Sequence, residues 1–268
     1  MMHLKRWLTS IVALPLLVYM IASGPRWIFY GLLFAASGVG LLEFFRMTAP
    51  QLPSPVKVIS VLLSFLFFYC LWRGPFFQVF AVFCLWVMIP LTFFLFSPPA
   101  SRNRAAEDLG KVALGFLYVS LPLALLLLID RHPRGNLWIL FLLAVIFLGD
   151  TGAFYFGRLF GKRKLYASVS PGKTWAGAFG GFLFSVLSGL FFSRFFDLGE
   201  FPLKMVVLAG CLGVCGQIGD LVESMIKRSA GVKDSGRILP GHGGMLDRVD
   251  ALLFAIPVLY LFLSWSAP

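Results

Sequence analysis

Residues 137–156 read LWILFLLAVIFLGDTGAFYF, twenty residues among which Asp150 is the only charged side chain. A helix of about 20 mostly apolar residues is long enough to cross the hydrocarbon core of a bilayer. A carboxylate at membrane depth is costly and usually has a functional role. The stretch therefore predicts a transmembrane helix that carries a functional group toward one end.

The rest of the chain repeats this pattern. Hydrophobic residues make up 59% of the 268 residues and charged residues 13%, whereas a soluble domain has about 25% charged residues. Nine segments resemble a span in length and composition: Trp7–Ser23, Trp27–Phe45, Val58–Trp72, Phe76–Phe96, Val112–Ile129, Leu137–Phe156, Trp175–Phe196, Leu203–Val222 and Ala251–Trp265. We therefore predict an all-α fold, a polytopic bundle of about nine transmembrane helices.

Lysine and arginine are divided unevenly between the two sides of this predicted bundle. One side holds 17 of the 23 and the other side holds 6. Because cytoplasmic loops are enriched in these residues, we place the N-terminus in the cytoplasm and the C-terminus outside, in a bacterial-type inner membrane. The first segment also resembles a cleaved signal peptide, but its apolar run is long for one, and we favour a retained helix.

The predicted spans divide the chain into two parts. Residues 1–130 hold spans one to five, and residues 131–268 hold the catalytic helices with two cytoplasmic loops, 157–174 and 223–250. These loops are rich in charge and glycine, so we expect the chemistry there. The net charge of +11 suits anionic headgroups better than nucleic acid, because no basic segment lies apart from the hydrophobic ones.

Five carboxylates are expected to converge at the inner ends of the spans. They are Asp150, Asp220, Glu223, Asp247 and Asp250. Asp247 and Asp250 are three residues apart and share a helix face. Carboxylate oxygens can hold Mg²⁺, which takes one or two of them together with substrate phosphates and water. Pairing with Arg228, Arg248 or a backbone carbonyl is the structural alternative, but convergence on one bilayer face favours function.

The helix that carries Asp220 has further polar groups on the same face. Glu223 and Ser224 follow Asp220 at i+3 and i+4, and Lys227 continues that face one turn later. Residues 227–244, KRSAGVKDSGRILPGHGG, then mix cations with glycines. Glycine lets the backbone approach phosphate, and Lys and Arg compensate its charge. This is not a P-loop, because GxxxxGK[ST] is absent from the sequence.

Two residues in the loops suggest individual roles. Lys173 precedes Thr174 at the start of a predicted helix, where phosphate is favoured, and Thr174 is a candidate N-cap. His242 lies between glycines. It is a weak sign of acid–base catalysis, and a hydrogen bond that orders the backbone is an equal alternative. Arg163 and Lys164 are interpreted as positive-inside anchors.

These loops resemble those of the phosphatidate cytidylyltransferases, also called CDP-diacylglycerol synthases. Residues 224–228 (SMIKR), 233–234 (KD) and 242–250 (HGGMLDRVD) look like the complete family signature. Further similar stretches are residues 150–162, Ser170-Pro171-x-Lys173-Thr174, residues 217–220 (QIGD) and, outside the catalytic part, Glu43. Ala176 departs from the pattern, because many relatives have Glu or Gln there, so no acidic role is expected at that position.

The resemblance implies that CTP reacts with phosphatidic acid to give CDP-diacylglycerol and pyrophosphate. It implies Mg²⁺, with K⁺ as a companion ion, on Asp220 and Asp247, and Asp150, Glu223 and Asp250 are further candidate ligands. The catalytic residues that it suggests are Asp220, Lys227, Arg228, Asp247 and Arg248. The substrate-binding residues that it suggests are Arg158, Lys162, Ser170, Lys173, Thr174, Ser224, Lys233, His242, Gly243 and Gly244. Membrane lipids and a second copy in a homodimer are the expected partners.

Two alternatives from the same residues stay open. A CTP-dependent kinase for a lipid alcohol, of the polyprenol or phytol type, would need similar phosphate-binding groups. A cation-coupled transporter would also carry intramembrane carboxylates, but near mid-span and in corresponding halves. Here the carboxylates lie toward inner helix ends, in one half and beside basic loops. That arrangement favours an enzyme.

Overall fold

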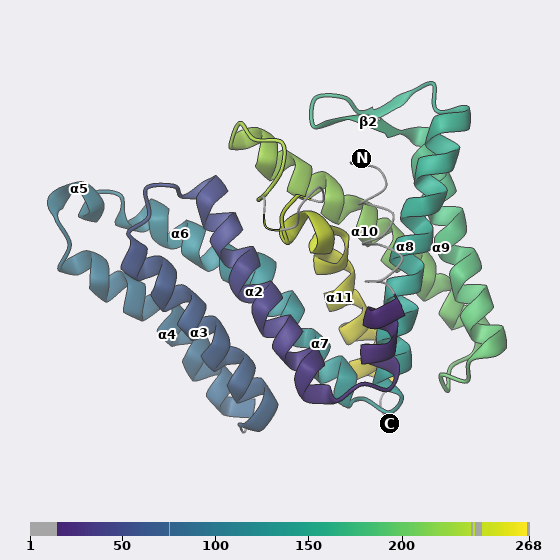
Figure 1. The fold of residues 1–268 in the computed structure, drawn as a ribbon, viewed down its shortest axis with the longest axis horizontal. Helices are drawn as coiled ribbons and strands as arrows, with labels where there is room; N and C mark the ends of the chain where they lie inside the picture. Colours follow the sequence, from purple (N-terminus) through teal and green to yellow (C-terminus); the bar gives the residue numbers. More distant parts are fainter. Residues whose placement is uncertain (1–14, 75, 237, 239–242, 267–268) are drawn as a thin grey trace.

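The computed structural model describes residues 15–74, 76–236, 238 and 243–266 (Figure 1). Helices account for almost all of its regular structure. They are α2 (Arg26–Thr48), α3 (Ser54–Arg73), α4 (Phe76–Leu95), α5 (Pro99–Arg102), α6 (Ala105–Gly115), the π-helical turn η1 (Phe116–Ser120), α7 (Leu121–Arg131), α8 (Gly135–Phe160), α9 (Trp175–Phe195), α10 (Pro202–Ser229) and α11 (Leu246–Ser266). The all-α, polytopic prediction is confirmed.

Seven helical segments of the described chain are long and apolar enough to cross a membrane. They correspond to the second to eighth predicted spans. The ninth, Ala251–Trp265, lies within helix α11, which is not one of the seven. The first, Trp7–Ser23, falls largely outside the described residues, of which 15–22 are helical. The total of nine spans and the orientation of the termini therefore stay predictions.

The predicted span Val112–Ile129 is not one regular helix. Helix α6 passes through η1 into α7, where Pro122 lies in the first turn. Proline lacks an N–H and crowds the carbonyl four residues earlier, and a π turn is one way to accommodate it. Ser120 of η1 accepts hydrogen bonds from Ser37 at 3.1 Å and Ser64 at 3.0 Å, and all three are fully buried. These bonds link η1 to α2 and α3.

Small residues set how closely the helices around the carboxylates approach. In Figure 1, α8 and α9 run side by side, α10 and α11 lie next to them, and α3 and α4 form the opposite edge. A Cβ on Gly152 of α8 would come within 2.7 Å of the Gly180 carbonyl of α9, and one on Gly177 within 2.8 Å of the Ala153 carbonyl. Glycine therefore permits this close backbone packing, as in other membrane helices.

A short hairpin interrupts the helical pattern between α8 and α9. Strands β1 (Lys164–Tyr166) and β2 (Ser170–Thr174) are antiparallel, with Lys164 opposite Thr174 and Tyr166 opposite Ser170. The sequence reading did not predict it. The hairpin and the loop after α10 lie at the same end of the bundle (Figure 1). The two loops chosen for their charge and glycine content therefore share one end.

Candidate active site

A cavity of about 460 Å³ opens between α8, α9, α10 and the hairpin. Five predicted site residues line it: Asp150, Arg158, Lys173, Thr174 and Asp220. Apolar side chains, Phe154 and Leu165 among them, form much of the rest of its wall, together with Gln217. The cavity thus combines cations and carboxylates with an apolar surface, which suits a ligand that has both a phosphate and an apolar part.

An ion pair crosses this cavity. Lys173 Nζ of β2 lies 2.7 Å from Asp220 Oδ2 of α10, with side chains 25% and 37% exposed. The position of Lys173 is fixed because β2 continues directly into α9, whose N-cap is Thr174: its hydroxyl oxygen accepts the Gly177 N–H at 3.1 Å. The N-cap prediction is confirmed. Because both charges remain partly exposed, the pair can exchange partners with a ligand.

Three carboxylates share this region. Asp150 and Asp250 both lie within electrostatic range of Asp220. The close approach of α10 and α11 at Gly219 makes this possible, since a Cβ there would come within 2.5 Å of the Asp250 carbonyl oxygen. Asp250 is also within range of Lys227. It therefore lies between the cavity and a second charged cluster.

That second cluster is more deeply buried. Lys227 of α10 is ion-paired with Glu223 on its own helix, and its Nζ donates to Asp247 Oδ1 at 2.6 Å. The side chains of Lys227, Glu223 and Asp247 are 13%, 1% and 9% exposed. The predicted shared face of Glu223 and Lys227 is confirmed. Lys227 thus fixes the end of α10 to the start of α11.

The other oxygen of Asp247 organises the loop between these helices. Asp247 Oδ2 accepts hydrogen bonds from Ser235 N at 2.9 Å, Ser235 Oγ at 3.0 Å and Gly244 N at 2.8 Å. Burial raises the pKa of Asp247, but the hydrogen bonds from Lys227 and from the backbone N–H groups of Gly244 and Ser235 outweigh it and lower the pKa to about 2. Asp247 is therefore a carboxylate at neutral pH.

A residue of α2 completes this network. Glu43 is fully buried, and its Oε1 accepts the Met245 N–H at 3.0 Å. Its Oε2 accepts the Leu246 N–H and the Ser235 hydroxyl, each at 3.0 Å. The sequence reading noted Glu43 but assigned it no role. The feature that could have indicated a role is that Glu43 is a lone carboxylate near the end of an apolar span.

The remaining predicted residues lie around these two clusters. Arg228 is exposed, and its Nε contacts the Val169 carbonyl of the hairpin at 3.4 Å, so the two loops meet there. Ser224 Oγ lies 3.5 Å from Asp220 Oδ1. Lys162 and Lys233 are exposed, and Ser170 lies in β2. Arg248 is in the first turn of α11 and is exposed.

The conformation of the loop just before α11 depends on two glycines, Gly243 and Gly244. Gly243 has φ +81°, in the left-handed region, and a Cβ there would come within 2.5 Å of Asp247 Oδ2. Gly244 supplies one of the N–H groups that Asp247 accepts. Predicted residue His242 lies outside the described residues. The two glycines thus let the loop close around Asp247, and their contact with a substrate stays a prediction.

Sequence comparisons give the family of the chain. The pattern of the cytidylyltransferase family matches residues 4–266. The chain belongs to the cytidylyltransferase family. A phosphatidate cytidylyltransferase of Staphylococcus epidermidis is 37% identical over 267 residues, which cover 96% of this chain and 98% of that protein. One from Bacillus subtilis is 31% identical over 97% of each chain. Family membership confirms that the protein is an enzyme, a nucleotidyltransferase.

The carboxylates of this cytidylyltransferase are the residues that could bind a metal ion. Among the described residues, no group of three or more His, Cys, Asp or Glu side chains is arranged as a ready metal site. The oxygens of Asp150, Asp220 and Asp250 are nevertheless the hard ligands that Mg²⁺ prefers. Asp247 is already in hydrogen-bond contact with Lys227, Ser235 and Gly244. These residues are therefore candidate ligands by the chemistry of their oxygens, and both the metal ion and its particular ligands stay predictions.

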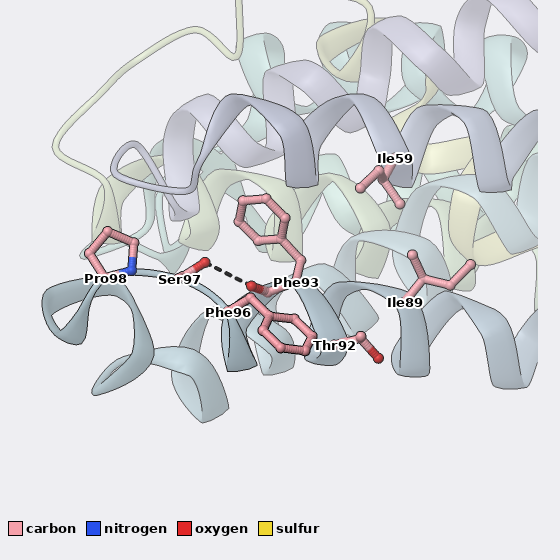
Figure 2. A pocket seen from close by; sticks show the side chains of 7 residues that line it. All are labelled: Ile59, Ile89, Thr92, Phe93, Phe96, Ser97 and Pro98. Atoms are coloured by element: carbon pink, nitrogen blue, oxygen red, sulfur yellow. Dashed lines mark hydrogen bonds between the residues drawn. The ribbon is translucent and has the colours of Figure 1, made fainter.

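A second cavity, of about 480 Å³, lies at the other side of the bundle between α3 and α4 (Figure 2). Ile59 of α3 faces Ile89 and Phe93 of α4 across it, and the wall continues through the end of α4 to Pro98. Its polar side chains are Thr92 and Ser97, whose hydroxyls donate to helix carbonyls at 2.8 Å. Because no charged residue lines it, we assign no phosphate chemistry to it.

Proposed function

We propose that the enzyme transfers the cytidylyl group from CTP to phosphatidic acid, giving CDP-diacylglycerol and pyrophosphate. The observation that carries this proposal is the cavity with the Lys173–Asp220 ion pair at a helix end. The names of the Staphylococcus epidermidis and Bacillus subtilis relatives support the choice of substrates. We place this site at the cytoplasmic face of a bacterial inner membrane, because 17 of 23 cations belong to the loops of that side.

The reaction needs little acid–base catalysis. A phosphate oxygen of phosphatidic acid forms a bond to the α-phosphorus of CTP, and the bond from that phosphorus to the oxygen bridging to the β-phosphorus breaks. The lipid phosphate is already an anion, so no strong base has to remove a proton. The protein has to bring two anions together in line and neutralise the departing pyrophosphate.

The cations of the site are suited to that task. Lys173 and Arg158 line the cavity, and we propose that they bind substrate phosphate oxygens. Lys227 is held rigidly beside it by Asp247 and Glu223. We propose that Mg²⁺ on Asp220 and Asp247, with Asp150, Glu223 or Asp250 as further donors, supplies additional positive charge when bound.

Lipid access follows from the apolar wall of the cavity. Phe154 lines the cavity and is 60% exposed, and Trp175 and Phe179 at the start of α9 are 55% and 63% exposed. Large apolar side chains at this depth suit contact with acyl chains. We propose that phosphatidic acid enters sideways along α8 and α9 while CTP enters from the aqueous end.

The products of purified enzyme test this function. Detergent-purified protein with CTP should release pyrophosphate, in equal amount with CDP-diacylglycerol, only when phosphatidic acid is present. A lipid-alcohol kinase would instead release CDP when given a polyprenol. Release of CDP with the alcohol, or of pyrophosphate without phosphatidic acid, would refute the proposal.

The same assay tests the cavity. Lys173→Met should greatly reduce turnover. Lys204→Met is the matched control, because Lys204 also forms an ion pair, with Glu200 at 3.0 Å, but in the first turn of α10, away from the cavity. Equal activity of the two variants would remove the cavity from the mechanism.

A further inference from the structure

Glu43 joins the N-terminal helices to the catalytic loop. It lies on α2, about 190 residues before the loop that it contacts. Its two carboxylate oxygens accept three hydrogen bonds, from Ser235 Oγ, Met245 N and Leu246 N. The last two are N–H groups at the start of α11, which have no partner within the helix. Glu43 therefore provides from another helix the cap that α11 needs.

The loop is built around this carboxylate. A Cβ on Gly236 would come within 2.7 Å of Glu43 Cδ and 3.1 Å of Glu43 Cγ. A Cβ on Gly244 would come within 2.5 Å of Glu43 Oε2. A Cβ at Gly236 would therefore displace the Glu43 side chain, and a Cβ at Gly244 would displace both Glu43 and the Ser235 hydroxyl. Glycine at these two positions leaves room for the Glu43 carboxylate beside the loop.

Ser235 connects Glu43 with the charged cluster. Its Oγ is 3.0 Å from both Glu43 Oε2 and Asp247 Oδ2, and its backbone N–H donates to Asp247 Oδ2. The hydroxyl has a single proton for the two carboxylates. Asp247 in turn accepts from Lys227. A continuous path of hydrogen bonds thus runs from α2 through Ser235 and Asp247 to α10.

We propose that Glu43 is a positioning residue that holds Asp247, and through it Lys227, in the geometry used for cytidylyl transfer. This inference rests on the proposed function, in which both residues belong to the active site. Glu43 itself is fully buried and reaches the reaction only through Ser235 and the start of α11. The first helices are accordingly part of the catalytic unit.

Glu43→Gln tests this role with almost no change in shape. The amide has one acceptor oxygen and an NH₂ group, which would face a backbone N–H donor of Met245 or Leu246. Because a displacement of about 1 Å can cost on the order of 100-fold in rate, we expect kcat of the folded variant to fall about 10- to 100-fold. Ser235→Ala, which removes only the bridging hydroxyl, should cause a smaller loss.

The double variant Glu43→Gln/Ser235→Ala is the decisive measurement. If both residues act along one path, its kcat should lie within about threefold of that of Glu43→Gln alone, because coupled sites are not additive. The controls are Glu107→Gln, a carboxylate 60% exposed on α6, and Ser60→Ala, a buried hydroxyl bonded to the Val56 carbonyl. Both should keep the wild-type kcat.

Hydrogen exchange supplies a readout that does not require turnover. The amides of Ser235, Gly244, Met245 and Leu246 are hydrogen-bonded to the two carboxylates. Their exchange should accelerate in Glu43→Gln and stay unchanged in Glu107→Gln. This result would support the loop contact even if the wild-type enzyme failed to use CTP and phosphatidic acid, so failure of the proposed function is recognisable separately.

Several outcomes would overturn the proposal. Losses of kcat that multiply in the double variant would show that Glu43 and Ser235 act independently. A Glu43→Gln protein that is less stable but keeps kcat and KM in its folded fraction would show a structural role alone. Should Glu43→Gln fail to fold, an unchanged kcat in Ser235→Ala would refute the path through that hydroxyl.

Discussion

Lys227 is the cation shared by two buried carboxylates, Glu223 and Asp247. Its replacement gives a quantitative test of this buried cluster. Lys227→Met keeps the length and apolar stem of the side chain but removes the ammonium between Glu223 and Asp247. These two carboxylates are 1% and 9% exposed. The substitution therefore leaves two buried negative charges without the cation that they share.

The expected cost follows from this burial. Removing one partner of a buried ion pair destabilises a protein by about 3–5 kcal/mol. Asp247 retains its hydrogen bonds from Ser235 and Gly244, so the lower end of this range, about 3 kcal/mol, is expected. For a protein of this size that corresponds to a fall in Tm of roughly 6–12 °C. The control Lys204→Met removes an ammonium whose side chain is 55% exposed, so it should change stability by about 1 kcal/mol or less.

A second substitution separates stability from catalysis. Glu223→Gln added to Lys227→Met removes the most buried of the uncompensated charges, so the double variant should regain about half or more of the lost Tm. Turnover should not return, because we propose that the Lys227 ammonium acts as pyrophosphate departs. Accordingly kcat should stay low and KM for CTP nearly unchanged in both variants.

Thermal unfolding in detergent and steady-state pyrophosphate release are the two assays. A Tm of Lys227→Met within about 2 °C of wild type would show that the cluster is not the buried network described. Recovery of turnover in the double variant would show that Lys227 has only a structural role. A large rise in KM with unchanged kcat would place Lys227 in ground-state binding instead.

Three further predictions concern the charged residues of the two loops. Asp220→Asn should abolish turnover while the protein still folds and extracts normally, and Asp247→Asn should abolish turnover in its folded fraction; near-normal activity of either at ordinary Mg²⁺ would refute its assignment as a ligand. Lys233→Ala should raise KM for CTP. Arg228→Lys should not fully restore the activity lost in Arg228→Ala, because an ammonium cannot make bidentate phosphate contacts. If kcat and KM stay unchanged in these variants, the two cations are membrane anchors. Single cysteines at Lys164 and Lys233 on a cysteine-free background should react with a membrane-impermeant thiol reagent only after permeabilisation, and labelling in intact cells would reverse the orientation.

Hydropathy predicts the helices of this protein well because each span has to be apolar along its whole length. It could not predict the π turn at Phe116–Ser120 or the hairpin Lys164–Thr174. The π turn depends on Pro122 and on serines of two other helices. The hairpin is too short and too polar to show an alternating pattern. Both features are decided by contacts that a window along the sequence does not contain.

In the candidate site, too, the sequence predicted local features but not contacts between distant segments. Helical spacing correctly placed Glu223 and Lys227 on one face, and the position of Thr174 before a helix correctly indicated an N-cap. Spacing could not show that Lys173 pairs with Asp220 across about 50 residues, or that Glu43 caps α11. A carboxylate in an apolar span indicates that a partner exists. Which residue that partner is depends on how the helices pack.

The Lys173–Asp220 pair in the cavity and the Lys227–Asp247 pair in the buried cluster differ in burial, and this difference suggests that they have different roles. Lys173 and Asp220 are 25% and 37% exposed, so water already competes for their charges and a phosphate can replace the contact at small cost. Lys227 and Asp247 are 13% and 9% exposed and belong to a network that reaches Glu43. Breaking that network is expensive. We therefore expect substrate exchange at the cavity pair, while the buried cluster links α10, α11 and α2.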